Sequence, residues 1–182
     1  MKPFFNLLFL LLTTGVFAQV EGQSFCEGTS NGSYLPLNIA FKKIYWYDTF
    51  YYEKTIGKKV FNGKEYIQIE QKWENGNIDV LYLREENGAV LEYQKCCNTD
   101  ALRYTPNKSI DENWYTKEKK INTTVISKNA NLKTPFCYYK DLLVLRVAFE
   151  SGESFDFYYL KGLGYVGATK EGTLVSCITP EK

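Results

Sequence analysis

The chain has 182 residues and is almost electrically balanced, with 22 lysines and arginines against 21 aspartates and glutamates. Binding of nucleic acid depends on a basic surplus or stripe, so this composition argues against a nucleic-acid partner. The sequence also contains no histidine, which excludes serine–histidine and cysteine–histidine nucleophile pairs and histidine-based metal sites.

Residues 1–18 have the features of a secretory signal peptide. Lys2 provides a positive start, an apolar run follows from Phe4 to Leu12, and small residues around Ala18 resemble a cleavage site ahead of Gln19. The apolar run is too short for a permanent membrane-spanning helix. We therefore expect a secreted or periplasmic protein with no transmembrane span and no lipid anchor on Cys26.

The mature chain, residues 19–182, is long enough for one domain with its own hydrophobic core. Its first part, residues 19–37, is rich in glycine and serine and poor in apolar residues until Leu35. We expect this part to be an irregular lead-in to a single β-rich domain.

From Phe41 onward the sequence predicts strands joined by tight turns. Residues 44–51 alternate in the manner of a strand, and Asn-Gly pairs stand at residues 62–63, 75–76 and 87–88. An Asn-Gly pair adopts positive φ at little cost and closes hairpins between antiparallel strands. A further hairpin is expected at residues 150–153.

The middle of the chain is less regular. Short strands are expected at residues 111–115 and 121–127, with a loop at residues 129–131. Strands at residues 142–149, 155–159 and 173–178 complete the prediction. The fold class is therefore all-β, an antiparallel meander curled into a barrel or half-barrel, with a β-sandwich as the alternative.

Gly162, Gly164 and Gly167 match the spacing of the dinucleotide-binding fingerprint. That fingerprint requires a following helix and a second parallel strand, and only 15 residues remain after Gly167. We therefore interpret these glycines as structural, permitting a kinked strand and a tight turn.

The segment Asp156-Phe-Tyr-Tyr-Leu-Lys-Gly-Leu-Gly-Tyr-Val-Gly, preceded by Thr134-Pro-Phe-Cys, resembles the C-terminal signature of TapB-like exported bacterial proteins. Residues 108–114 are similar to a midchain stretch of the same family, with Asp-Glu-Asn in place of its usual glycine-rich turn. The resemblance implies a secreted or periplasmic β-rich domain, and the family carries no assigned reaction.

All five cysteines lie in the mature chain, where export would expose them to an oxidising compartment. We expect Cys137 to pair with Cys177, and Cys26 to pair with Cys96 or Cys97. For the adjacent Cys96 and Cys97, structural bridges to other partners are favoured over a vicinal disulfide or a soft-metal site.

Aromatic residues make up 16% of the chain, and some of them are candidate ligand contacts because they combine a flat apolar face with a polar edge. The candidates are Trp46, Tyr51, Trp73 and Trp114. Aromatic residues also form strand cores, so each could equally be a packing residue.

The sequence favours an exported, non-enzymatic β-domain with a binding or cell-envelope support role. A lipid-like or other small apolar molecule is the favoured ligand, and an envelope protein is the alternative partner. The alternatives are a carboxylate-dependent glycan hydrolase and a protein-interaction module without a cavity. The acid pairs Glu85-Glu86 and Asp111-Glu112 are interpreted as turn residues, so we predict no catalytic residue, metal ligand or cofactor.

Overall fold

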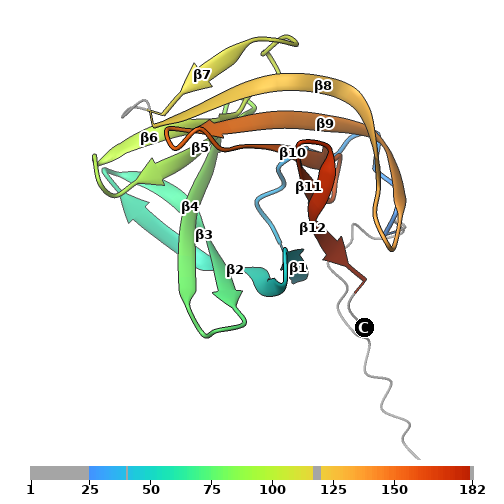
Figure 1. Cartoon of the computed structure of the whole chain (residues 1–182). Helices are drawn as coiled ribbons and strands as arrows, with labels where there is room; N and C mark the ends of the chain where they lie inside the picture. The colour runs from blue at the N-terminus through green and yellow to red at the C-terminus, as the bar shows by residue number, and fades with distance from the viewer. Residues whose placement is uncertain (1–24, 40, 117–119, 181–182) are drawn as a thin grey trace, which may run out of the picture.

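The computed structural model describes residues 25–39, 41–116 and 120–180, and the predicted signal peptide lies outside these residues. Twelve antiparallel strands form one sheet (Figure 1). The strands are β1 (Lys42–Trp46), β2 (Thr49–Phe61), β3 (Lys64–Trp73), β4 (Ile78–Glu86), β5 (Ala89–Gln94), β6 (Thr99–Tyr104), β7 (Asn113–Tyr115), β8 (Ile121–Lys133), β9 (Tyr138–Phe149), β10 (Ser154–Leu160), β11 (Gly164–Lys170) and β12 (Thr173–Thr179).

The sheet is a meander that curls almost into a closed barrel, which confirms the predicted fold class. Its strand order is β6-β5-β4-β3-β2-β1-β12-β11-β10-β9-β8-β7, so strands that follow each other in sequence pair, except β6 and β7, and β12 returns to pair with β1. Within the described residues, β6 and β7 are the two edges of the sheet. Shifts of register in β2–β3, β5–β6, β8–β9, β10–β11 and β11–β12 supply the bends that such curvature requires.

The asparagine-glycine turns are confirmed. Asn62 and Asn87 have φ values of 51° and 53°, and the glycine after each also has positive φ. The predicted strand over residues 44–51 is wrong, because Tyr47 with φ 54° turns the chain there and separates β1 from β2. The predicted loop at residues 129–131 is also wrong, since β8 continues to Lys133.

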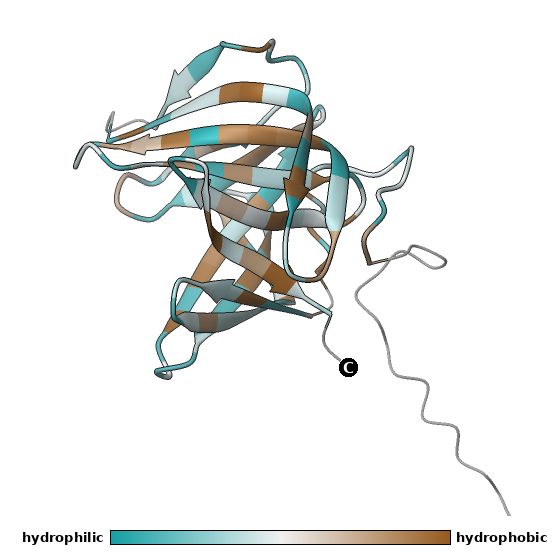
Figure 2. Ribbon diagram, turned by 45° about the vertical axis from the view of Figure 1, so that its right-hand side comes forward, coloured by the Kyte–Doolittle hydropathy of each residue, from teal (hydrophilic) through white to brown (hydrophobic). Residues whose placement is uncertain are grey.

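Hydrophobic and hydrophilic residues alternate along strands such as β3 and β10, and both kinds are interspersed over the sheet in Figure 2. Such alternation places one set of side chains inside the barrel and the other outside. One interior cluster joins Ile69 of β3 and Leu83 of β4 to Leu143 and Leu145 of β9. The core therefore spans the barrel from one wall to the other.

The segment before β1 contributes to that interior cluster. Leu35 and Ile39 pack in it, and the segment runs through the space that the strands enclose (Figure 1). Backbone bonds join Thr55 N to Ile39 O at 2.7 Å and Gly162 N to Ser33 O at 2.8 Å. The described segment before β1, residues 25–39, includes most of the predicted lead-in, contains no strand and partly fills the barrel.

Candidate functional site

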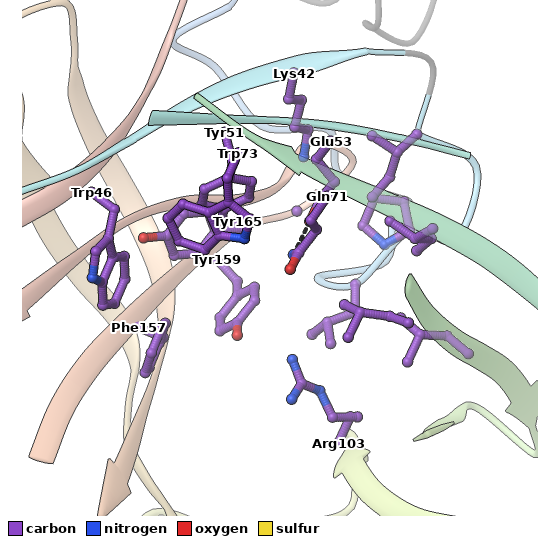
Figure 3. A pocket seen from close by; sticks show the side chains of 17 residues that line it. Lys42, Trp46, Tyr51, Glu53, Gln71, Trp73, Arg103, Phe157, Tyr159 and Tyr165 are labelled. Atoms are coloured by element: carbon purple, nitrogen blue, oxygen red, sulfur yellow. Dashed lines mark hydrogen bonds between the residues drawn. The ribbon is translucent and has the colours of Figure 1, made fainter. Parts of the chain in front are cut away.

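A cavity of about 280 Å³ lies inside the barrel (Figure 3). Its lining consists of six aromatic residues, a group of aliphatic residues and a few polar side chains. The aromatic residues are Trp46, Tyr51, Trp73, Phe157, Tyr159 and Tyr165, and the polar ones are Lys42, Glu53, Gln71 and Arg103. The remaining lining residues are Leu35, Pro36, Ile39, Ile69, Leu81, Leu83 and Gly164.

The six aromatic side chains form one wall of the cavity, called the aromatic wall below. Its part on β1, β2 and β3 follows from the register of these strands. Tyr51 is the cross-strand partner of both Ile44 and Trp73, so these side chains share the inner face. The rings of Tyr51 and Trp73 lie 4.7 Å apart, centroid to centroid. On the other side of the wall, Trp46 of β1 stacks on Phe157 of β10 at 6.1 Å.

The polar residues form the next row across the same three strands. Lys42 pairs in register with Glu53, and Glu53 pairs with Gln71. The Gln71 side-chain amide donates a 2.7 Å hydrogen bond to Glu53 Oε2, and Lys42 Nζ donates to the carbonyl oxygen of Leu163. Burial lowers the pKa of Lys42, and the nearby charge of Glu53 opposes that shift.

Arg103 enters the cavity from β6, on the side facing Glu53 and Gln71 (Figure 3). Its Nη1 lies 3.3 Å from Glu92 Oε2, and its side chain keeps 43% of its surface open. Burial by itself would lower the pKa of Arg103, but the surrounding acidic groups, Glu92 foremost, raise it above the usual value. The guanidinium is therefore a permanent cation in the cavity.

The tyrosines of the cavity remain neutral near neutral pH. Burial raises the pKa of Tyr51, Tyr159 and Tyr165, and nearby groups such as Glu53 raise it further. The Tyr165 hydroxyl donates to Ser176 Oγ at 2.6 Å. These side chains can offer aromatic faces and hydroxyl groups to a ligand, but not negative charge.

The structure brings three of the four predicted ligand contacts together, since Trp46, Tyr51 and Trp73 all line the cavity. Trp114 lies elsewhere, on β7, where its indole N–H donates a 2.8 Å hydrogen bond to Leu102 O of β6. It joins the two open edges of the sheet and is not among the residues that line this cavity.

Sequence reasoning missed the polar residues of the cavity. Glu53 and Gln71 each stand two positions from an aromatic residue that was predicted, and a strand places such residues on one face. The two-residue period of a strand could therefore have identified Glu53 and Gln71 as neighbours of the predicted aromatic residues. Nothing local pointed to Arg103, because β6 was not predicted.

The cysteines pair differently from the expectation. Cys26 bonds to Cys137, Cys96 bonds to its neighbour Cys97, and Cys177 is a buried free thiol. The expected pairings of Cys137 with Cys177 and of Cys26 with Cys96 or Cys97 are wrong. The tip of the β8–β9 hairpin lies beside the N-terminal lead-in, which places Cys137 next to Cys26.

The acid pairs noted in the sequence lie outside the cavity. Glu86 accepts a 2.9 Å hydrogen bond from Arg84, which lowers the pKa of Glu86, and Glu112 is held by the Ser109 backbone and Lys108. Glu53 is the one carboxylate among the lining residues. In the described part of the chain, no three histidine, cysteine, aspartate or glutamate residues cluster in a way that could hold a metal ion.

No protein-family model matches the sequence, and no curated protein matches it either. Two solved structures resemble the fold. A predicted exported protein with a YmcC-like fold from Bacteroides fragilis has 9% identity and a TM-score of 0.47, with 82% of this chain and 100% of that chain covered. A predicted lipoprotein from Parabacteroides distasonis has 10% identity and a TM-score of 0.47, with 83% and 98% covered.

The resemblance to TapB-like proteins gains no support from these comparisons and stays a prediction. No helix among the described residues has the length and hydrophobicity needed to cross a membrane.

Proposed function

We propose that this protein is an exported, non-enzymatic binding protein that holds a small ligand with an apolar body inside its barrel. The aromatic-lined cavity carries this proposal. Ligand pockets are usually concave, largely apolar and supplied with a few oriented polar groups, and this cavity has each of these features. Its volume of about 280 Å³ is near the lower end of the usual range, so a small ligand fits best.

Export is supported by the signal-like residues 1–18 and by the disulfide between Cys26 and Cys137. Such a bond persists in oxidising compartments and is rare in the cytosol. A secreted or periplasmic location would place the barrel where small envelope or extracellular molecules reach it.

Two observations make the alternatives weaker. A glycan hydrolase needs two cooperating carboxyl groups across its cleft, and Glu53 is the one carboxylate that lines this cavity. An interaction module without a ligand would be expected to have a filled core, in contrast to this cavity.

Tryptophan fluorescence offers a direct test, because the chain has three tryptophans and only some of them lie in the cavity. Trp46 and Trp73 line the cavity, whereas Trp114 lies at the sheet edge. Titration with 1-octanol, a neutral molecule with an apolar chain, should change the emission of the wild-type protein in a saturable manner. The change should disappear in the W46F/W73F double variant and persist in W114F.

Native mass spectrometry of protein isolated from its exported fraction provides the second measurement, and a co-purifying small molecule is expected. A saturable signal that survives in W46F/W73F would place the binding outside the cavity and contradict the proposal. Absence of both a co-purifying molecule and any saturable response would contradict it as well.

A further inference from the structure

The lining of the cavity has an aromatic side and a cationic side, and this arrangement favours a ligand with both an apolar part and a polar group. Its aromatic wall is formed by β1, β2, β3, β10 and β11, while Arg103 enters from β6 (Figure 3). We infer that the ligand carries a carboxylate group, which binds the Arg103 guanidinium while its apolar body lies against the aromatic wall. This inference rests on the proposed function and names the class of ligand.

Arg103 has hydrogen-bonding capacity that the described residues leave unused. A guanidinium carries five N–H donors in a fixed planar fork. Among the described residues, the one carboxylate within 4.0 Å of its nitrogens is Glu92, at 3.3 Å from Nη1. The Arg103 side chain is 43% exposed and lines the cavity, so a ligand there can approach its guanidinium.

The other charged side chains of the cavity are already engaged. Lys42 is 8% exposed and its ammonium group donates to Leu163 O. Glu53, also 8% exposed, accepts a hydrogen bond from Gln71 and has Lys42 as its neighbour in register. Arg103 is therefore the charged group of the lining that is best placed to bind a ligand.

Charge and shape both favour a carboxylate. Two cationic side chains and one carboxylate line the cavity, so the lining favours an anionic ligand over a cationic one. A carboxylate matches the guanidinium fork and accepts two parallel hydrogen bonds from it. Tyr159 interacts electrostatically with Arg103, and its neutral phenol is a further donor on this side.

The experiment compares two probes that differ only in the head group, octanoate and 1-octanol, at a pH where octanoate is ionised. Wild-type protein should bind octanoate more tightly than 1-octanol. The R103Q variant should lose about 10- to 100-fold in octanoate affinity, which corresponds to charge-assisted hydrogen bonds, and keep its affinity for 1-octanol. R103K should recover only part of the loss, because an ammonium lacks the fork.

Two further variants separate binding from folding. E92Q removes the protein's own competitor for Arg103 and should raise octanoate affinity. R146Q is the matched control, since Arg146 forms a bidentate ion pair with Asp156 and does not line the cavity. It should leave the affinity for both probes unchanged.

The outcomes distinguish this inference from the proposed function. Equal binding of octanoate and 1-octanol by the wild type, or a fall in octanoate affinity in E92Q, would overturn the carboxylate inference and leave an apolar binding protein. Failure of both probes to bind would overturn the proposed function together with the inference.

Discussion

Gly164 lies where the lead-in and the polar row meet the start of β11. Its φ is 83°, a backbone conformation that costs residues with a Cβ atom free energy. A Cβ atom at this position would lie 3.0 Å from Pro36 Cδ and 3.3 Å from Lys42 Nζ. The glycine motif of residues 162–167 therefore serves a close approach of backbone and side chains at the cavity.

Substitution of Gly164 by alanine should destabilise the protein more than the same change at Gly152. Gly152 has a similar φ of 87°, but a Cβ atom there would meet nothing within 4 Å, so G152A reports only the backbone cost, about 1–2 kcal/mol. G164A adds the contact with Pro36 and should cost at least about 1 kcal/mol more. Urea unfolding measures both, and equal losses would contradict a steric role for Gly164.

At the scale of elements, the long β8–β9 hairpin and the lead-in hold each other in place. Cys137, at the hairpin tip, is bonded to Cys26 and packs in a cluster with Leu132, Tyr139 and Leu142. The bond joins residues 111 positions apart in the sequence. It therefore closes a loop that includes most strands of the barrel.

The C26A/C137A double variant should lose about 4–5 kcal/mol of unfolding free energy in the chain-entropy model, because the unfolded chain gains freedom. The C96A/C97A variant is the matched control, since its bond joins adjacent residues and restricts almost no loop. Denaturant unfolding without reductant compares the two. A loss in C96A/C97A as large as that in C26A/C137A would contradict this account.

At the scale of the whole molecule, the barrel is closed on one side by strand pairing and on the other by side chains. β12 pairs with β1 over four residue pairs, whereas β6 and β7 are the unpaired edges of the described sheet. The Trp114 indole connects these edges through its bond to Leu102 O, and its ring packs against the interior cluster of Leu143 and Leu145.

The W114F variant keeps a ring at this position but removes the N–H donor. We expect a loss of about 0.5–1.5 kcal/mol, the usual net contribution of one hydrogen bond. Hydrogen exchange should quicken at β6 and β7 while the junction of β1 and β12 stays protected. A uniform change in hydrogen exchange across the barrel would show that Trp114 does not specifically stabilise the contact between the β6 and β7 edges.

The sequence by itself determined what depends on local chemistry. Asparagine-glycine pairs adopt positive φ at little cost, so the turns at residues 62–63 and 87–88 were predictable, and alternation identified the strands around residues 142–149 and 155–159. The turn at Tyr47 was not, because tyrosine gives no such signal. Trp46, Tyr51 and Trp73, which line the cavity, could be proposed as ligand contacts from side-chain chemistry alone.

Tertiary structure decided which inward-facing rows meet and which cysteines approach each other. Lys42, Glu53 and Gln71 form one row only because of the register between β1, β2 and β3, and Arg103 faces that row only because the sheet curls. Cys26 reaches Cys137 because the fold brings the start of the described lead-in beside the tip of the β8–β9 hairpin. Such contacts depend on the sum of many weak, long-range packing terms, and no short stretch of sequence contains that sum.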